Sequence, residues 1–450
     1  MEAPALEAPL IADDVENSNE NCPSPEVSDA GAAKRREGNS WYAIAVQISN
    51  SMIGSGILAF PNALAQTGSV LFSFDISVFI VAVYASSAML AMAGERRAIL
   101  NFSRLTEDVF GPRTAKVIGV SIALVNFGAL LNYLTILGSI GSKLISQWTD
   151  GINDVVDTNA GFIAVVAVCL LPLAMFRTYG ELAPFSAFAL AMVAAVTLFV
   201  SINGNLEAGS PGFYIAQPWQ KTVFSGLKIL GALSYASSDQ QVILEAYLST
   251  AKEDKPKFSS NTLVLASIIG FSLLCAMSVF GCSAFGQACD AEILSNFDVS
   301  EPAVQAAYLL VVLHLMFYIP NDFIIMRLFA LESFGYEVLD MSSRTFICVT
   351  VVLFAIPCVL MASVPPSDVS GVFSYTIDLT GDLPTGFACF AMPAAIYLKV
   401  FTEKADRTVL WYLAIPTVLL GLILMIICPV VDTVLFAGAC LSGGKGCSEY

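Results

Sequence analysis

Residues 47–61 place two glycines and several small polar side chains inside a long apolar stretch. The stretch reads Gln-Ile-Ser-Asn-Ser-Met-Ile-Gly-Ser-Gly-Ile-Leu-Ala-Phe-Pro, so Gly54 and Gly56 stand two residues apart. Two glycines at this spacing weaken an α-helix, and unwound backbone is tolerated at membrane depth only where it lines a cavity. The backbone N–H groups that such a break frees suit a carboxylate. The alternative is a helix-packing face of small residues, with Ser51 and Ser55 four apart.

A second polar stretch interrupts the apolar residues 222–251. Residues 235–239 read Tyr-Ala-Ser-Ser-Asp, so five consecutive polar or small residues end in a carboxylate. A charged group at the centre of a bilayer costs several kcal/mol unless it is paired or hydrated. The stretch therefore cannot face lipid, and we expect both 53–56 and 235–239 to be non-helical and close together. Tyr235, beside this break, is a candidate contact for a bound solute.

Two further side chains could carry a proton within the apolar segments. His314 is the sole histidine of the chain, and its ordinary pKa near 6.5 suits a proton carrier. The alternative for His314 is a structural hydrogen bond to a neighbouring helix. Asp239 is the other candidate, with a helix-end cap as its alternative role. Asp322 follows Pro320 and is expected to act as a gate or to pair with Arg327.

The composition shows which elements must position these residues. Apolar residue types make up 56% of the 450 residues and charged types only 13%, whereas soluble domains carry about 25% charged residues. A soluble enzyme is therefore excluded, and we expect no catalytic activity. The net charge of −16 excludes a nucleic-acid binder. The chain is predicted to be an all-α polytopic membrane protein embedded in the lipid bilayer.

A helix that crosses the bilayer needs about 20 mostly apolar residues. Ten stretches free of Asp, Glu, Lys and Arg fit this requirement, and the interrupted stretch 222–251 adds another. The first stretch, 38–74, holds one helix near 41–65. The remaining charge-free stretches are 76–94, 117–142, 158–176, 182–206, 258–289, 302–321, 345–367, 383–398 and 408–431. The sequence thus predicts eleven transmembrane helices.

Basic residues predict the orientation of these helices. With a cytoplasmic N-terminus, 17 of the 21 Lys and Arg residues fall on the inner side and 4 on the outer side. Residues 1–38 are predicted to be a disordered acidic cytoplasmic tail, 39–436 the domain of eleven spans, and 437–450 an outer or lumenal segment. Cys440 and Cys447 in that last segment form either a disulfide or two free thiols.

Two interrupted helices at corresponding positions indicate internal symmetry. The first and sixth spans would each open a repeat of five helices, about 41–204 and 222–400, and 408–431 would be an extra helix. An odd number of helices inverts the second repeat, and paired broken helices are typical of transporters with a site at the bilayer midplane. No nucleotide-binding loop of the GxxxxGK[ST] type occurs, which disfavours ATP-driven pumping.

Several motifs resemble the amino acid/auxin permease family, which includes neutral amino-acid transporters. Residues 50–58, Asn-Ser-Met-Ile-Gly-Ser-Gly-Ile-Leu, resemble its first-helix signature. Residues 102–112 are similar to its loop between spans two and three, and 171–177 to the end of its span four. Residues 379–381 with Pro393 and Ala394 resemble its span ten. The resemblance covers about 41–430 and implies a LeuT-like fold of five plus five inverted helices and an extra helix, with coupled transport of amino acids.

The coupling ion stays open between H⁺ and Na⁺. In sodium-coupled members, the first-helix asparagine and a threonine on span eight help to hold the ion. Asn50 matches the asparagine and is the candidate sodium ligand, but Leu313 to Pro320 contain no threonine, which favours the proton. The substrate is expected to contact Ser51, Gly54, Ser55, Gly56, Tyr235, Ser237 and Ser238, and the coupling ion Asn50, Asp239 and His314. No other cofactor is expected.

The function predicted is ion-coupled transport of amino acids by alternating access around the broken helices. The alternative is a membrane amino-acid sensor that uses the same site with little flux. The amino acid itself, the oligomeric state, and the choice between plasma membrane and vacuolar or lysosomal membrane are left open by the sequence.

Overall fold

A computed structural model describes residues 38–149, 158–177, 186–207, 223–403 and 407–441. Residues 1–37 of the predicted tail 1–38 and most of the segment 437–450 lie outside these ranges. The described part of Asn39–Tyr450 is built of helices, and its one β-bridge joins Asn39 to Thr250.

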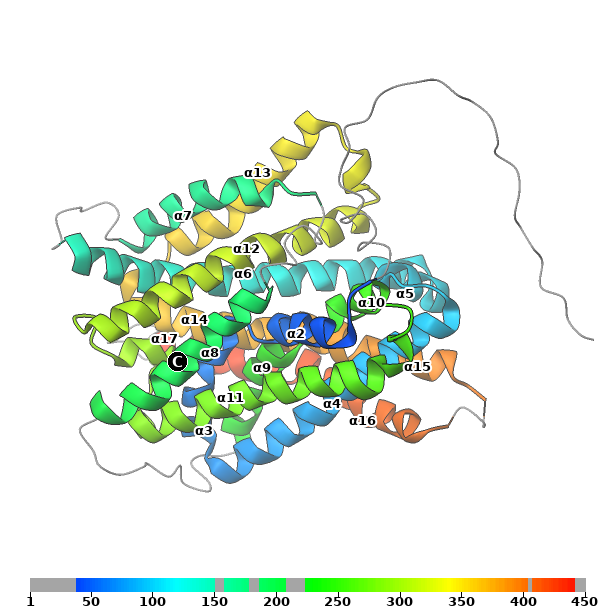
Figure 1. Ribbon diagram of the computed structural model, residues 1–450, viewed down its shortest axis with the longest axis horizontal. Coiled ribbons are helices and arrows are strands. Elements are labelled where there is room, and N and C mark those ends of the chain that lie inside the picture. The colour runs from blue at the N-terminus through cyan, green and yellow to red at the C-terminus, as the bar shows by residue number, and fades with distance from the viewer. Residues whose placement is uncertain (1–37, 150–157, 178–185, 208–222, 404–406, 442–450) are drawn as a thin grey trace, which may run out of the picture. The chain divides into compact units, whose positions relative to one another are not determined.

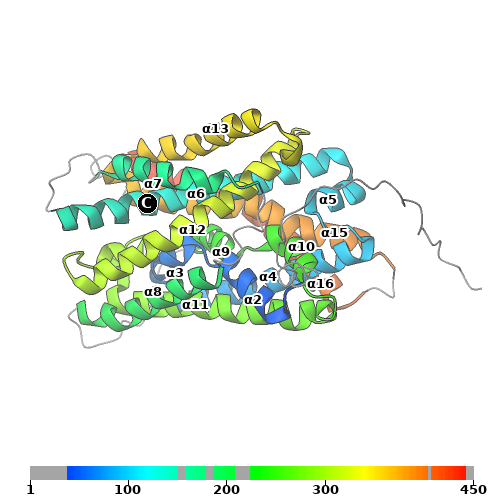
Figure 2. The same cartoon turned by 45° about the horizontal axis from the view of Figure 1, so that its top comes forward.

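The helices follow the predicted order along the chain (Figures 1 and 2). The first six predicted spans correspond to α2 (Trp41–Met52) with α3 (Phe60–Thr67), α4 (Ser69–Arg97), α6 (Pro112–Thr149), α7 (Asn159–Ala174), α8 (Ser186–Glu207), and α9 (Val223–Ser237) with α10 (Gln240–Ser249). The next five correspond to α11 (Leu263–Phe285), α12 (Pro302–Ser333), α13 (Ser343–Ala362), α14 (Val369–Thr380) with η9 (Gly381–Ala391) and α15 (Met392–Val400), and α16 (Val409–Ile426) with α17 (Cys428–Leu441). A short amphipathic helix, α5 (Phe102–Phe110), connects α4 to α6.

Not all of these segments satisfy a length and hydropathy criterion for crossing a membrane. In the described residues eight do so alone, and α2 with α3 makes a ninth that is bent by 54°. The α7 helix has 16 residues, and α9 and α10 have 15 and 10. The helical segments therefore match the eleven predicted stretches in order, while the count of eleven complete crossings stays a prediction.

Several helices extend beyond the boundaries predicted from charge. Asp75 lies inside α4, and Asp378 and Asp382 lie inside the continuous segment Val369–Val400. Each of these carboxyl groups is buried, so a window that stops at the first charge ends the helix too early. The last helix also continues past 431 and 437 to Leu441.

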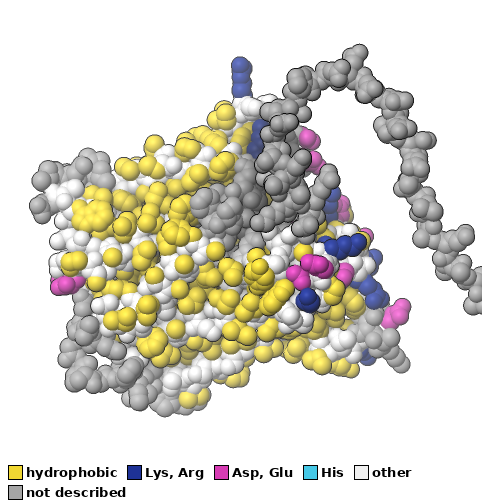
Figure 3. All heavy atoms as spheres, viewed as in Figure 1, with side chains coloured by type: hydrophobic (Ala, Val, Ile, Leu, Met, Phe, Trp, Pro, Cys, Tyr) yellow, Lys and Arg dark blue, Asp and Glu magenta, His cyan; other side chains and the backbone are white. Residues whose placement is uncertain are grey.

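Apolar side chains cover the sides of the helical unit as well as its core. The face in Figure 3 is mostly hydrophobic, and its Lys and Arg side chains gather toward one end. Outward-facing residues such as Val168 and Val409 are about three-quarters exposed, at 73% and 75%. An apolar outer surface of this kind fits a hydrocarbon environment.

The connections between helices divide between two ends of the unit. At one end Arg96 lies over the ring of Phe401, and Lys399 lies over Phe110. The Asn39–Thr250 bridge lies at the end of α10, which Figures 1 and 2 place on the same side as α5 and α15, and we call this side the basic end. At the other end Lys143 donates to Ser295. This grouping agrees with the predicted alternation of loops, although which end faces the cytoplasm stays a prediction.

Long helices surround the two interrupted ones. In both views α6 and α12 run side by side, and α9 lies in the interior (Figures 1 and 2). The residues on the packed face of α9, including Leu233 and Ala236, are almost fully buried. The interruption in α9–α10 is therefore enclosed by protein.

Candidate functional site

The first break lies where the glycines predicted it. The α2 helix ends at Met52, Ile53 and Gly54 are non-helical, and a 3₁₀ helix, η1 (Ser55–Ala59), leads into α3. The first N–H groups of a helix have no acceptor within it, and here they belong to Ser55 and Gly56. The prediction of a break is confirmed, with the refinement that 55–56 form a 3₁₀ turn.

The second break is shorter than predicted. Only Ser238 and Asp239 are non-helical, between the end of α9 at Ser237 and the start of α10 at Gln240. The prediction that 235–237 are also non-helical is wrong. The hydroxyl groups of Ser237 and Ser238 donate to the carbonyl oxygens four residues earlier, a local bond compatible with helix.

The first break lies against the last turn of α9, just before the second break. A Cβ atom added to Gly56 would lie 2.6 Å from Cβ of Ala236 and 3.0 Å from Cδ1 of Tyr235. The hydroxyl groups of Ser55 and Tyr235 are 3.3 Å apart, within hydrogen-bond distance. Spans one and six therefore meet through polar groups, with the first break of span one against the last turn of α9. Gly56 makes the close approach of the two backbones possible.

A tyrosine and an aspartate from other helices extend this polar centre. Tyr133 on α6 donates to Oδ2 of Asp322 on α12 over 2.9 Å. The Tyr133 hydroxyl would lie 2.9 Å from a Cβ atom on Gly54, so it contacts the first break directly. The alternative prediction of an Asp322–Arg327 pair is wrong, because Arg327 donates to the carbonyl of Ala174 instead. Sequence reasoning missed Tyr133, which stands in an apolar run and whose partner is 189 residues away.

His314 lies beside the first break. Its Nδ1 is 3.1 Å from the carbonyl oxygen of Ala189, which can only accept, so Nδ1 carries a hydrogen. Nε2 is buried and has no hydrogen-bond partner in the described part of the chain. His314, Gly54 and Ser55 line one void of about 10 Å³, which holds about one water molecule. One ring nitrogen thus has the structural role offered as the alternative, and the other has no partner among the described residues.

Asp239 occupies the second break and binds to α4. It is 2% exposed, and its Oδ1 accepts from the hydroxyl of Ser87 over 3.0 Å. It stands at the N-cap position of α10 but makes no side-chain capping bond, contrary to its alternative role. The next residue, Gln240, donates to the hydroxyl of Ser86 over 2.8 Å. Two adjacent serines of α4 therefore hold the break of span six.

The remaining predicted residues lie on the helix that precedes the first break. Asn50 is 6% exposed, and its Oδ1 accepts no hydrogen bond from any described residue. Ser51 is half-buried. An amide oxygen of this kind is a suitable ligand for Na⁺ or a partner for a polar substrate. Groups of three or more His, Cys, Asp or Glu side chains that could hold a metal ion are absent from the described ranges.

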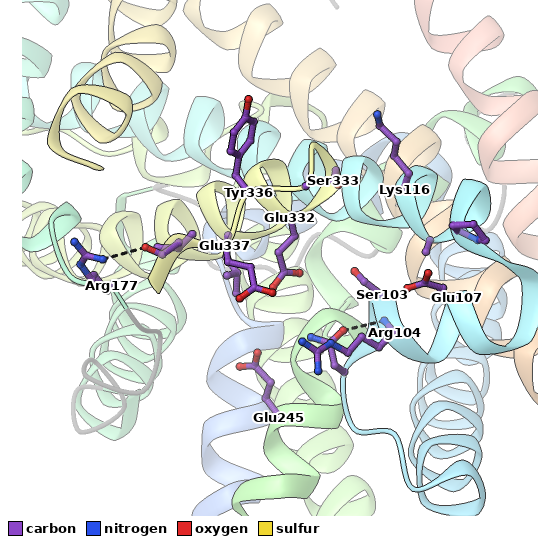
Figure 4. Close-up of a pocket in the computed structure, with 16 residues that line it drawn as sticks. Ser103, Arg104, Glu107, Lys116, Arg177, Glu245, Glu332, Ser333, Tyr336 and Glu337 are labelled. Atoms are coloured by element: carbon purple, nitrogen blue, oxygen red, sulfur yellow. Dashed lines mark hydrogen bonds between the residues drawn. The ribbon is translucent and has the colours of Figure 1, made fainter. Parts of the chain in front are cut away.

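Cavities open at both ends of the unit. The cavity at the basic end measures about 770 Å³, and Glu332, Glu337 and Glu245 point into it opposite Arg104 (Figure 4). A cavity of about 440 Å³ at the other end is lined by residues that include Thr135 and Asp290. Neither lining includes a residue of the two breaks. The polar centre lies between two openings without being exposed to either.

Comparison with known proteins identifies the family. Residues 37–431 match the family profile described as transmembrane amino acid transporter protein. The chain belongs to this family. The match confirms the resemblance to amino acid permeases inferred from 50–58 and the later motifs.

Two relatives of this transporter cover most of its length. Sodium-coupled neutral amino acid symporter 2 of Danio rerio is 23% identical over 416 residues, 84% of this chain and 79% of that protein. Vacuolar amino acid transporter 5 of Schizosaccharomyces pombe is 20% identical over 368 residues, 79% of this chain and 84% of that protein. Both relatives are transporters, in line with the expectation that this protein is not an enzyme.

A solved structure shows the same fold. The manganese transporter of Eremococcus coleocola superposes with a TM-score of 0.58 over 93% of this chain and 94% of that one, at 12% identity. The predicted fold class, an all-helical polytopic membrane protein with a LeuT-like fold, is confirmed. The exact repeat boundaries remain predictions.

Proposed function

We propose that this transporter is an amino acid symporter whose substrate binds between the two breaks. The observation that carries the proposal is the Ser55–Tyr235 contact, which joins the first break to the last turn of α9, just before the second break. The N–H groups of Ser55 and Gly56 begin a helical turn and can receive the α-carboxylate of any amino acid. Ser51, Gly54, Ser237 and Ser238 border the same breaks and belong to the proposed site.

The coupling ion in this proposal is the proton. Asp239 lies in the second break, and His314, whose Nε2 has no hydrogen-bond partner among the described residues, lines the void beside the first. Asp322 is linked to Gly54 through Tyr133. These three side chains can each exchange a proton, and all lie in or beside the two breaks.

Sodium is the second candidate for the coupling ion, and one observation on Asn50 favours it. Oδ1 of Asn50 is buried without a partner among the described residues, as expected of an oxygen that binds a cation. The Danio rerio relative is named as sodium-coupled. Against this, the part of span eight before Pro320 contains Met316 and Phe317, whose side chains offer no oxygen ligand.

Alternating access supplies the proposed mechanism. The polar centre lies between a cavity at each end of the unit, so small movements of the broken helices would connect it to one cavity at a time. We propose that the basic end is cytoplasmic, because cytoplasmic loops carry the excess of Lys and Arg. The membrane in which the protein resides is left open between plasma membrane and vacuole or lysosome.

Uptake into proteoliposomes tests this function. Purified protein is reconstituted and offered a mixture of labelled amino acids with a proton gradient, a sodium gradient or neither. We expect accumulation with the proton gradient. Accumulation with the sodium gradient alone would contradict proton coupling and would indicate that Na⁺, bound at Asn50, is the coupling ion.

Counterflow separates transport from sensing. Vesicles loaded with an unlabelled amino acid are expected to take up the labelled form without any ion gradient. Binding of the amino acid without counterflow would contradict the transport proposal and favour the membrane sensor.

A further inference from the structure

A buried carboxamide on α6 has no partner for either of its polar atoms. The side chain of Asn132 is 0% exposed, and neither Oδ1 nor Nδ2 forms a hydrogen bond with any described residue. An unpaired polar group inside a protein lowers its stability, so such groups are rare, and each one calls for a functional role, a bound water or a bound ion. The contacts of the two breaks do not account for Asn132.

Other buried polar residues of the same helix form their hydrogen bonds locally. Nδ2 of Asn126 donates to the carbonyl oxygen of Ile122 over 2.8 Å, and the hydroxyl of Thr135 donates to that of Leu131 over 2.7 Å. Both acceptors lie four residues earlier in the chain. Asn132 forms no bond of this kind, so its amide stays available to a group that comes from outside the helix.

Asn132 lies on the face of α6 that leads to the cavity of about 440 Å³. Residues three and four apart share one face of an α-helix. From Asn132 this spacing continues through five residues that line the cavity, namely Thr135, Ile136, Ser139, Ser142 and Lys143. Asn132 itself does not line the cavity. It therefore lies one turn deeper on the same face, toward the centre of the unit.

The same face of α6 reaches span ten and α9. Gly128 precedes Asn132 by four residues, and a Cβ atom added to Gly128 would lie 2.6 Å from Cγ2 of Thr380. A Cβ atom added to Gly381, the residue after Thr380, would lie 2.8 Å from the backbone N of Tyr235. Spans three, six and ten are therefore packed closely here, and Asn132 lies beside their junction.

The residue after Asn132 brings the first break to the same turn of α6. The hydroxyl of Tyr133 would lie 2.9 Å from a Cβ atom on Gly54. Successive residues of an α-helix project about 100° apart, so Asn132 and Tyr133 occupy neighbouring sides of one turn. That turn therefore lies between the first break, on the side of Tyr133, and the last turn of α9, on the side of Asn132.

The two unpaired atoms of Asn132 match the charged head of an α-amino acid. Oδ1 is an acceptor, and Nδ2 carries two N–H donors. An α-ammonium group only donates and an α-carboxylate only accepts, so one amino acid can satisfy both atoms. A metal ion would satisfy only Oδ1, and an inorganic anion only Nδ2. A water molecule is the other group that can both donate and accept.

We propose that Asn132 binds the α-amino-acid head of the substrate, with Oδ1 accepting from the ammonium group and Nδ2 donating to the carboxylate. The substrate reaches Asn132 from the cavity of about 440 Å³, along the face of α6 that carries Thr135 and Ile136. Because the head is common to all amino acids, Asn132 contributes to affinity without selecting a side chain. This assignment rests on the proposed function, since it needs an amino acid between the breaks.

Asn132→Leu tests the assignment, because leucine has a similar branched shape and no polar atom. We expect KM to rise by about tenfold or more for every amino acid transported, since two hydrogen bonds to the substrate are lost. We also expect the Tm without substrate to equal or exceed that of the parent, because the variant buries no unpaired amide. Asn132→Ala, which adds no volume to the junction, is measured in parallel and is expected to raise KM equally.

Asn126→Leu is the matched control, because Asn126 is 1% exposed on the same helix and already bonded within it. We expect it to keep the parent KM. A parent KM in both Asn132 variants would overturn the assignment and leave a water molecule as the partner of the amide. A rise in KM restricted to amino acids with polar side chains would also overturn it, since Asn132 would then contact the side chain and not the head.

Tyr235→Phe separates this assignment from the proposed function. If KM rises in Tyr235→Phe but not in the Asn132 variants, the site between the breaks is supported and only the role of Asn132 fails. If the parent shows neither binding of an amino acid nor counterflow, the proposed function itself fails, and the assignment of Asn132 fails with it.

Discussion

The hydrogen bond between Ser55 and Tyr235 joins two residues that are 180 positions apart. Both were predicted from local signals, a polar residue between two glycines and a tyrosine at the edge of a polar stretch. Their meeting follows from the rule that interrupted helices must face protein or water and not lipid. The proposed site depends on this contact more than on any other single pair of residues.

Removal of the Tyr235 hydroxyl tests that contact. Tyr235→Phe keeps the ring against Gly56 and deletes one hydrogen bond, which is worth about 1 kcal/mol. We expect KM for the amino acid to rise about fivefold with little change in thermal stability. The matched control is Tyr412→Phe, whose parent ring is 60% exposed on α16. An unchanged KM in Tyr235→Phe would place the substrate elsewhere.

Several residues of the centre could not be predicted because their partners lie far away in the sequence. Tyr133 pairs with Asp322, and Ser87 with Asp239, across 189 and 152 residues. Nothing near Tyr133 or Ser87 distinguishes them from other polar residues in apolar helices. Asp239 was predicted because a carboxyl group in a span is itself a signal, whereas a tyrosine or serine there is not.

At the scale of the elements, the two glycines predicted the first break well, and the polar stretch 235–239 predicted the second break less well. Gly54 and Gly56 end α2 where expected, but serines 237 and 238 keep α9 helical one turn further by bonding to their own helix. A glycine inside a helix weakens it through its conformational freedom. A serine hydroxyl, in contrast, can bond to a carbonyl of its own helix or compete with the helical hydrogen bonds. This difference explains why the predicted second break was too long.

Gly56→Val tests how closely the two broken helices must approach. The new Cβ would overlap Ala236, so we expect spans one and six to separate and transport to fall below detection. Gly438→Val is the control, because no described atom lies within 4 Å of a Cβ added there. Monodispersity, thermal stability and counterflow are measured for both. A stable Gly56→Val protein that transports at the parent rate would show that the close contact between Gly56 and Ala236 is not needed for transport.

Outside the site, a buried arginine on α12, Arg327, bonds to the end of α7. It is 1% exposed and donates to the carbonyl oxygens of Ala174 and Phe176 at the end of α7, with its guanidinium 4.5 Å from the ring centre of Phe346. Arg327→Met leaves these carbonyls without a donor, at about 1–3 kcal/mol each. We expect a clear fall in Tm, and a smaller one for Arg327→Lys.

The exposed Arg113 supplies the control for that substitution. Arg113→Met is expected to keep the Tm of the parent, since it removes no buried hydrogen bond. Equal Tm values for Arg327→Met and Arg113→Met would show that the buried guanidinium does not hold the end of α7.

For the molecule as a whole, composition and the spacing of charged residues were sufficient to predict the class of protein and the order of its helices. The boundaries of α4 and of Val369–Val400 were missed, because Asp75, Asp378 and Asp382 are buried inside helices. A rule that treats every charge as a helix end cannot recognise a buried carboxyl group.

Orientation is tested by labelling from each side of the membrane. Lys252 lies near the basic end and Ser300 in the α11–α12 connection, and both are exposed. In a variant without the 11 native cysteines, we expect Lys252→Cys to react only from the cytoplasmic side and Ser300→Cys only from the other. Reaction of both from one side would contradict the predicted alternation of the spans.

The central claim is that an amino acid binds between the two breaks, and a cryo-electron microscopy map with a saturating transported amino acid tests it most directly. The account predicts substrate density with its carboxylate beside the N–H groups of Ser55 and Gly56 and its body near Tyr235. It also predicts that α2 and α9 remain interrupted at 53–54 and 238–239. Density confined to the cavity at the basic end, or continuous α-helix through either break, would contradict the account.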